Sequence, residues 1–198
     1  SIKGYVWYSP KEFSDKGYEI PTTLDELTAL SEKIAADSGH VPWCAGLGSG
    51  DATGWPGTDW IEDYVLRQAG PDFYDKWVTH AVPFNSPEIV KAFDSVGDIL
   101  KNPAMVNGGF GDVSTVISTE FGDAGLPILD GTCSLHHQAS FYEGFWPAGT
   151  KVAPDGDVYA FLLPPVNADD PQAVTGGGEF PVAFRDAKEV EAVRAYLS

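Results

Sequence analysis

Apolar residues recur at helical spacing in residues 21–39, the clearest periodic segment of the chain. Thr23 and Glu26 stand three positions apart at the start of this segment, which is the pattern of a capping box. One face of the predicted helix then carries Leu24, Leu27, Leu30 or Ser31, and Ile34. The segment therefore predicts an amphipathic helix with one face turned to a core.

A second helix is predicted over residues 86–102, where Ser86 is placed as the N-cap and Pro87 as the first helical residue. Its apolar stripe is expected to consist of Ile89, Phe93, Val96 and Leu100. Shorter helices are expected at residues 59–68, 71–80 and 113–121.

Short apolar runs between these helices predict strands. They lie at residues 1–8, 42–47, 132–137 and 158–162, and a turn-rich connector follows the first of them. The last residues, 177–198, read as a strand and then a helix capped by Asp186 and Glu189, with a stripe of Val190, Val193 and Leu197. Strands that alternate with helices predict an α/β layer structure with a central sheet flanked by helices.

The charge of the chain limits its partners. Twelve basic residues against 29 acidic residues, among 198 in all, give a formal net charge of −17, spread without an acidic block. Such a surface repels phosphate backbones and anionic lipids, so no nucleic acid partner is expected. No apolar run reaches the roughly 18–20 residues of a membrane span, so no membrane insertion is expected. A neutral or cationic ligand is compatible with this negative charge.

Aromatic residues make up 13% of the chain and include six Trp, which suits a sugar because pyranose C–H faces stack on flat rings. Trp55 stands out because it lies on a Gly/Pro-rich loop directly before a helix. Residues on such loops are often exposed for contact. From the residues alone, core packing and ligand stacking both remain open for Trp55.

The two cysteines, Cys44 and Cys133, both lie in strand-like stretches, and the sequence leaves open whether they are buried thiols or a disulfide. His136 and His137 are adjacent, so on a strand they point to opposite faces and cannot hold one metal together. We therefore expect no metal site.

No motif of covalent catalysis or phosphate binding is found. The chain has no G-x-S-x-G, and its GSGDATG loop lacks the Lys-Ser/Thr ending of a phosphate-binding loop. A glycosidase would need two carboxylates at a defined separation, but no pair among the 29 acidic residues has a recognisable context. The sequence predicts neither an enzyme nor a bound cofactor.

Several long segments resemble one family of binding proteins. They are YVWYSPKEF, IPTTLDELTAL, PWCAGLGSGDATGWPGTDWIEDYVLRQAGPDFYDKW, CSLHHQASF and GGGEFPVAFRDAKEVEAVRAYL. Together they are similar to the extracellular solute-binding proteins of carbohydrate ABC transporters, in their alpha-glucoside branch. The resemblance implies a type II periplasmic-binding-protein-like fold with two lobes and a sugar held between them.

The resemblance also implies site residues. Trp55 is expected to stack on the sugar, with Thr58 and Asp59 as hydroxyl partners. A second expected cluster of ligand-binding residues follows a strand: His137, Gln138, Ser140 and Phe141. Without the resemblance, this segment reads as a capped helix start. Gly176 and Gly177 are expected at the return crossover, as a hinge. The extracytoplasmic location implied by the family favours a disulfide between Cys44 and Cys133.

By the same resemblance, residues 1–175 form the second, ligand-binding lobe, and residues 176–198 form a return strand and helix of the first lobe. The chain is expected to be a piece of a longer protein that is lipid-anchored outside the cytoplasm. We expect it to bind a neutral mono- or oligosaccharide and to deliver it to the permease subunits of an ABC importer. The alternatives are the sugar-sensing domain of a signalling protein and a glycoside-active enzyme.

Overall fold

The computed structural model describes residues 1–109, 112–178, 182, 184, 186 and 188–197, without the side chains of residues 38 and 197. The strands are β1 (Tyr5–Tyr8), β2 (Trp43–Cys44), β3 (Val106–Asn107), β4 (Leu135–His137) and β5 (Tyr159–Leu162). The α-helices are α1 (Pro10–Lys16), α2 (Leu24–Ser38), α3 (Trp55–Ala69), α4 (Pro71–Val78), α5 (Pro87–Leu100), α6 (Phe121–Ala124) and α7 (Val190–Leu197). The 3₁₀-helices are η1 (Gly50–Ala52), η2 (Val113–Ile117), η3 (Leu126–Asp130) and η4 (Ser140–Phe145).

The five strands form one mixed sheet in the order β3-β2-β4-β1-β5. β2 runs parallel to β3 and β4, whereas β1 runs antiparallel to β4 and β5. Val6 on β1 pairs with His137 on β4, and Trp43 on β2 pairs with Leu135 on β4. This is the mixed central sheet flanked by helices that the sequence predicts.

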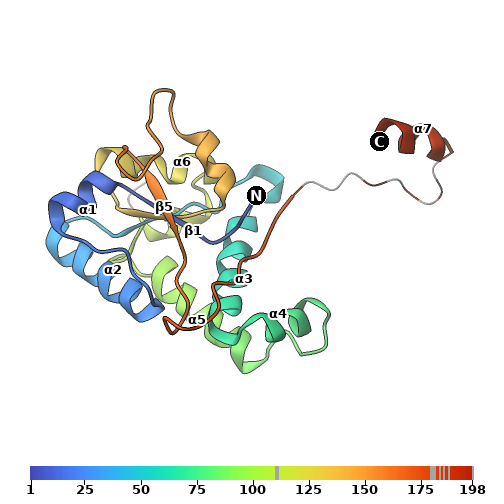
Figure 1. The fold of residues 1–198 in the computed structure, drawn as a ribbon, viewed down its shortest axis with the longest axis horizontal. Coiled ribbons are helices and arrows are strands. Elements are labelled where there is room, and N and C mark those ends of the chain that lie inside the picture. The colour runs from blue at the N-terminus through green and yellow to red at the C-terminus, as the bar shows by residue number, and fades with distance from the viewer. Residues whose placement is uncertain (110–111, 179–181, 183, 185, 187, 198) are drawn as a thin grey trace.

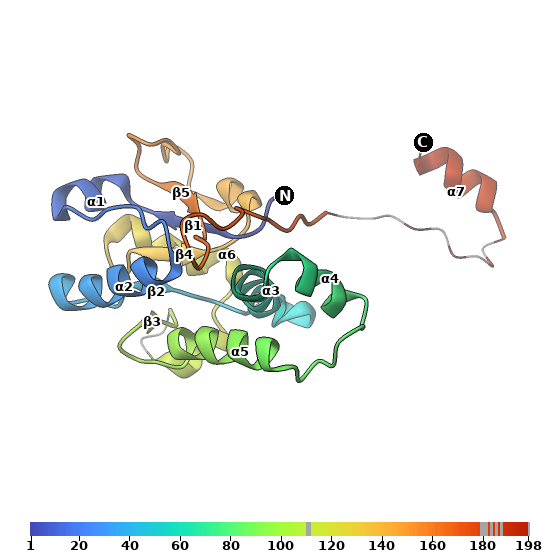
Figure 2. The same cartoon turned by 60° about the horizontal axis from the view of Figure 1, so that its bottom comes forward.

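The alternation of side chains along β1 builds a core on each face of the sheet. Val6 and Tyr8 join the larger core, formed with helices α2, α3 and α5, while Trp7 joins a smaller core on the opposite face. Figure 2 shows α2 and α5 together on one side of β1, β4 and β5. The result is a three-layer lobe with the sheet in the middle.

The smaller core contains a disulfide. Cys44, on β2, is bonded to Cys133, which precedes the neighbouring parallel strand β4, and their Cα atoms are 5.6 Å apart. The ring of Tyr142 packs beside them with those of Trp7 and Trp146. The disulfide predicted for these two cysteines is therefore confirmed.

The N-caps of the two long helices differ in detail. Thr23 Oγ1 accepts a hydrogen bond from the Glu26 amide at 3.2 Å, as the capping box predicts. The Glu26 carboxylate also accepts from the amide and the hydroxyl of Thr22. Ser86 precedes α5 but makes no capping bond, since its hydroxyl donates to the Pro83 carbonyl instead.

Two expectations about single elements are wrong, and two of the predicted strands are shorter than expected. The connector after the first strand contains helix α1, which Ser9 caps. Helix α5 packs on α3, and its buried stripe consists of Ile89, Ala92 and Val96. Phe93 follows Ala92 and is 46% exposed, so it does not lie on the core face of α5. The strands expected at residues 42–47 and 132–137 are real but cover only two and three residues.

The last helix, α7, stands apart from the other elements in Figure 1. Val190 and Val193 on its expected stripe are half-buried. The strand expected before α7 falls largely on residues 179–181, 183 and 185, outside the described residues. Among the residues that the structure describes, no helix is both long enough and apolar enough to span a membrane.

Candidate functional site

The two ends of the lobe meet in a short antiparallel pair of segments, residues 1–3 and 175–177, which we call the crossover passage. The Lys3 amide donates to the Thr175 carbonyl at 3.0 Å, and the Gly177 amide donates to the Ser1 carbonyl at 2.9 Å. Ile2 and Gly176 form a bridge between these contacts. In Figure 1 the chain leaves the lobe toward α7 from this place. The first residues of the chain therefore pair with the segment that leads toward α7.

The start of η4 is fixed on the crossover passage. The Ser140 amide donates to the Ile2 carbonyl at 2.8 Å, and Ser140 Oγ accepts from the Ile2 amide at 3.0 Å. Ser140 is half-buried and opens η4 directly after strand β4. The second predicted cluster thus lies beside the passage.

Four aromatic rings contact one another in a cluster that we call the aromatic platform: Trp55, Phe121, Phe141 and Phe145. The Trp55 ring lies 4.9 Å from Phe121 and 5.9 Å from Phe141, measured between ring centroids. Phe145 continues the surface at 5.3 Å from Phe121 and 5.8 Å from Phe141. Phe145 is 41% exposed, and the other three rings are half-buried. Trp55 and Phe141, predicted from separate parts of the sequence, are brought together here.

The place of Trp55 follows from the turn before α3. Gly54 has a φ of 106°, a conformation that favours glycine, and Pro56 follows Trp55 in the first turn of the helix. Thr58, one turn on, is exposed, and its hydroxyl donates to the Trp55 carbonyl at 2.8 Å. The turn therefore holds Trp55 at the very start of α3.

Lys3, in the crossover passage, binds two carboxylates of α3. Its Nζ lies 2.6 Å from Asp59 Oδ1 and 2.9 Å from Glu62 Oε2. Burial lowers the pKa of Lys3, but the hydrogen bonds to both carboxylates outweigh burial, so the pKa of Lys3 lies above its ordinary value. Asp59, predicted as a sugar partner, is buried and paired with Lys3.

His137 forms a buried pair with Asp63 of α3. Nε2 of His137 lies 2.8 Å from Asp63 Oδ2, and each side chain is 1% exposed. His136 points to the other face of the sheet, where its Nδ1 lies 3.0 Å from the Cys44 carbonyl. The opposite orientation of the two histidines confirms the strand geometry inferred from the sequence.

The remaining predicted residues lie on or next to the passage. Gln138 is buried, and its Oε1 accepts from the Ala139 amide at 2.9 Å, so its side chain supports the β4–η4 junction. Gly176 and Gly177 lie in the passage without a left-handed φ. A Cβ on Gly177 would lie 3.3 Å from Lys3 Cε, a tight contact with the end of a flexible side chain.

Sequence reasoning missed Phe121 and Phe145, which complete the platform, and Lys3 and Asp63, which tie the site to α3. The only local signal for the two phenylalanines is that each lies next to glycine in a segment with weak helical pattern. Lys3 and Asp63 carry no local signal, because their partners are more than 50 residues away along the chain.

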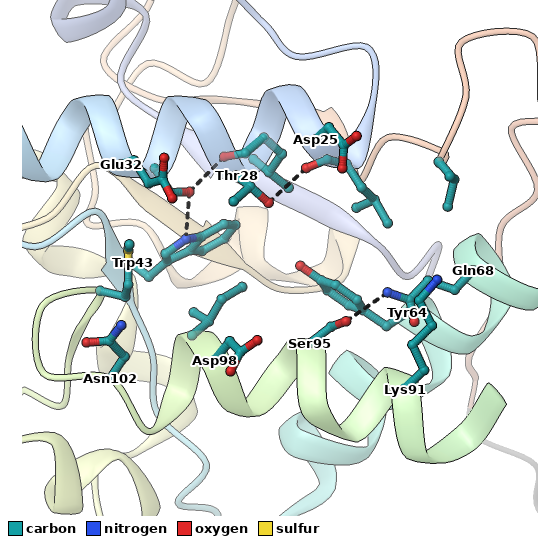
Figure 3. Close-up of a pocket in the computed structure, with 16 residues that line it drawn as sticks. Asp25, Thr28, Glu32, Trp43, Tyr64, Gln68, Lys91, Ser95, Asp98 and Asn102 are labelled. Carbon is teal, nitrogen blue, oxygen red and sulfur yellow. Dashed lines mark hydrogen bonds between the residues drawn. The ribbon is translucent and has the colours of Figure 1, made fainter. Parts of the chain in front are cut away.

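Two hollows lie away from the platform. A cavity of about 510 Å³ separates α2 from α5 and has Trp43 and Tyr64 on its wall, with Gln68 bound to Ser95 (Figure 3). A groove of about 750 Å³ beside the first turns of α3 is lined by Thr58, Trp77, Phe84 and Phe93 among others. Thr58 therefore faces this groove. Within residues 1–109, 112–178 and the other described positions, no group of three His, Cys, Asp or Glu could hold a metal.

The whole chain, residues 1–198, matches the family model described as bacterial extracellular solute-binding protein. The chain belongs to this family of solute-binding proteins. It is 44% identical over 99% of its length to the alpha-glucosides-binding periplasmic protein AglE of Rhizobium meliloti, and 40% identical over its full length to the osmoprotective compounds-binding protein GgtB of Synechocystis. It spans 42% and 46% of these two proteins, so this solute-binding chain covers less than half of their length.

Solved structures agree with the family assignment. The solute receptor AcbH, reported to prefer β-D-galactopyranose, matches 84% of this solute-binding chain with a TM-score of 0.67 and 25% identity, over 38% of its own length. The apo form of RafE from Streptococcus pneumoniae matches 99% of the chain with a TM-score of 0.65 and 16% identity, over 48% of its length. The second likeness concerns the fold alone.

Proposed function

We propose that this chain is the ligand-binding lobe of an extracytoplasmic receptor that captures a neutral sugar or oligosaccharide, of the alpha-glucoside type, for an ABC importer. The observation that carries the proposal is the aromatic platform beside the crossover passage. Flat, partly exposed rings bind the C–H face of a pyranose, and the sugar hydroxyls require polar partners around them. The alpha-glucoside-binding relative AglE, 44% identical, supports this ligand class.

Within this proposal residues 1–175 form the second lobe and residues 176–198 return to the first lobe. The pairing of residues 1–3 with residues 175–177 supports a boundary at this place, because both connections between lobes then run side by side. Two adjacent connections can act as a hinge, and the sugar stabilises the closed state when both lobes contact it. Closure then signals occupancy to the permease subunits.

The predicted site residues take two roles in this receptor. Trp55 and Phe141 stack on the sugar, and Ser140 and the passage glycines Gly176 and Gly177 offer polar groups to it, whereas Thr58 faces the groove beside α3. Asp59, His137 and Gln138 are buried and already hydrogen-bonded, which supports a role in holding α3 and η4 in place.

The receptor binds its ligand without chemistry. Its relatives AglE and GgtB are named as binding proteins, and Asp59 and Asp63 of α3 are buried and paired with Lys3 and His137. A glycosidase requires carboxylates that reach the scissile bond. The extracellular family also supports a location outside the cytoplasm, where a lipid anchor would keep the receptor near the permease.

The test is a thermal-shift screen of the full-length protein against neutral mono-, di- and trisaccharides. A ligand that binds only the folded state raises the melting temperature, and the shift grows with the logarithm of the ligand concentration above Kd. We expect stabilisation by one class of α-linked glucosides without release of product. Turnover of the sugar would favour a glycoside-active enzyme, and a transmembrane helix joined to a signalling domain in the full sequence would favour a sensor.

A further inference from the structure

Phe145 is an exposed ring that is held in a fixed position. It packs directly over Gly122, where a Cβ would lie 2.8 Å from the Phe145 ring. Its other neighbour is Tyr142, whose ring lies parallel to that of Phe145 at 5.4 Å. An apolar ring that is 41% exposed and yet fixed by close packing is preorganised for contact.

The ring beneath Phe145 is itself immobilised. Tyr142 is fully buried, and its hydroxyl donates to the Gly122 carbonyl at 2.8 Å and accepts from the Gly125 amide at 2.9 Å. These two bonds tie η4 to α6. The outer end of the aromatic platform is therefore built on a rigid base.

Trp55 and Phe145 stand at opposite ends of the platform, since each of them contacts both Phe121 and Phe141. Trp55 and Phe141 lie near the passage, where Ser140 contacts Ile2, and Phe145 continues the surface beyond Phe121. A single pyranose covers only part of such a surface.

The charges around the outer end fit hydroxyl groups. Glu120, Asp123 and Glu143, which lie within two residues of Phe121 or Phe145 in the sequence, are exposed. No Lys or Arg occurs between Lys101 and Lys151. Carboxylates accept hydrogen bonds from hydroxyls and repel anions. The outer end therefore favours an uncharged, hydroxylated ligand.

We propose that Phe145 forms a distal subsite, so that the ligand is a linear neutral oligosaccharide whose second or later pyranose stacks on this ring. This inference rests on the proposed function, because it assumes that a first sugar unit lies on Trp55 and Phe141. Phe145 then sets the preferred chain length of the sugar.

The experiment measures the affinity of the full-length protein for glucose, maltose, maltotriose and maltotetraose by isothermal titration. We expect the wild type to bind the longer sugars at least 10-fold more tightly than glucose. Phe145→Ala and Phe145→Leu should remove most of this advantage, with a loss of affinity that is much larger for the longer sugars than for the shortest bound sugar. Phe145→Leu keeps an apolar side chain over Gly122, so it separates loss of the ring from loss of folding.

Tyr159→Ala is the matched control, because Tyr159 is 38% exposed and pairs with Tyr8, at the end of β1 away from the passage. Tyr159→Ala should keep the whole dependence of affinity on the length of the sugar. Equal affinity of the wild type for all bound lengths, or an equal loss for every length in the Phe145 variants, would overturn the distal subsite and leave the proposed function standing. If no neutral sugar stabilises the wild type, the proposed function and the subsite both fail.

Discussion

Asp63 of α3 and His137 of β4 form a hydrogen-bonded pair in the core, with 2.8 Å between Oδ2 and Nε2 and with both side chains 1% exposed. The pair connects the sheet to the helix whose first residue is Trp55. Gly4 lies over it with a φ of 80°, and a Cβ there would lie 3.3 Å from Asp63 Oδ1. The pair therefore couples α3, the sheet and the first residues of the chain.

We predict that Asp63→Ala lowers the free energy of unfolding by roughly 3–5 kcal/mol, because removal of one partner leaves the other buried without compensation. Urea denaturation followed by circular dichroism measures the change. Asp63→Asn is the control, since it keeps an oxygen that accepts a hydrogen bond from His137, and its loss should be smaller. Unchanged stability of Asp63→Ala would show that water replaces the carboxylate.

The disulfide should contribute strongly to stability. It joins residues 89 positions apart, and closing a loop of that length stabilises the fold by roughly 4–5 kcal/mol on the chain-entropy model. Denaturation of the double variant Cys44→Ser/Cys133→Ser should begin at correspondingly lower urea concentration. A thiol assay of the unfolded, unreduced wild type should detect no free thiol, and two free thiols would contradict the prediction.

His136 should make the lobe sensitive to acid. Burial lowers its pKa to about 4, against the opposing effect of its hydrogen bond to the Cys44 carbonyl. The unfolded chain, with an ordinary histidine pKa near 6.5, then binds a proton more readily than the folded chain. The contribution of neutral His136 to the free energy of unfolding is complete above about pH 6.5. It falls by about 3 kcal/mol as the pH drops toward 4.

The test compares the free energy of unfolding of the wild type and His136→Asn between pH 7 and 4.5. Asparagine can still donate to the Cys44 carbonyl but does not titrate in this range. The variant should be less stable at pH 7 and should lose less stability on acidification. Parallel pH profiles for the two proteins would show that other groups cause the acid sensitivity.

Trp55→Ala should lower sugar affinity in the full-length protein by roughly 10- to 100-fold, or about 1.4–2.8 kcal/mol, because a stacked pyranose loses its main apolar contact. The fold should change little, since Trp55 is half-buried at the start of α3 and outside both hydrophobic cores. Isothermal titration against the sugar found in the thermal-shift screen measures the change, with Tyr159→Ala as control. Equal affinity of wild type and Trp55→Ala would show that Trp55 only packs against Phe121 and Phe141.

Local sequence determined the elements whose stabilising contacts are local. Helix α2 is marked by the Thr23 cap and by an apolar face of period 3.6, and both features act within a few residues. The same kind of signal was present for α1, where Ser9, Pro10 and Glu12 mark the start of a helix, although the segment reads as a connector. The alternation in β1 likewise places Trp7 opposite Val6 and Tyr8.

The site was decided by contacts between distant segments. Trp55, Phe121 and Phe141 come from three separate elements, and no local period indicates that their rings lie within about 6 Å of one another. The burial of Asp59 depends on Lys3, 56 residues earlier, which no pattern around Asp59 predicts. Sequence periodicity reports which face of an element is apolar. Which distant faces meet, and which polar groups are then buried in pairs, depends on the packing of the whole lobe.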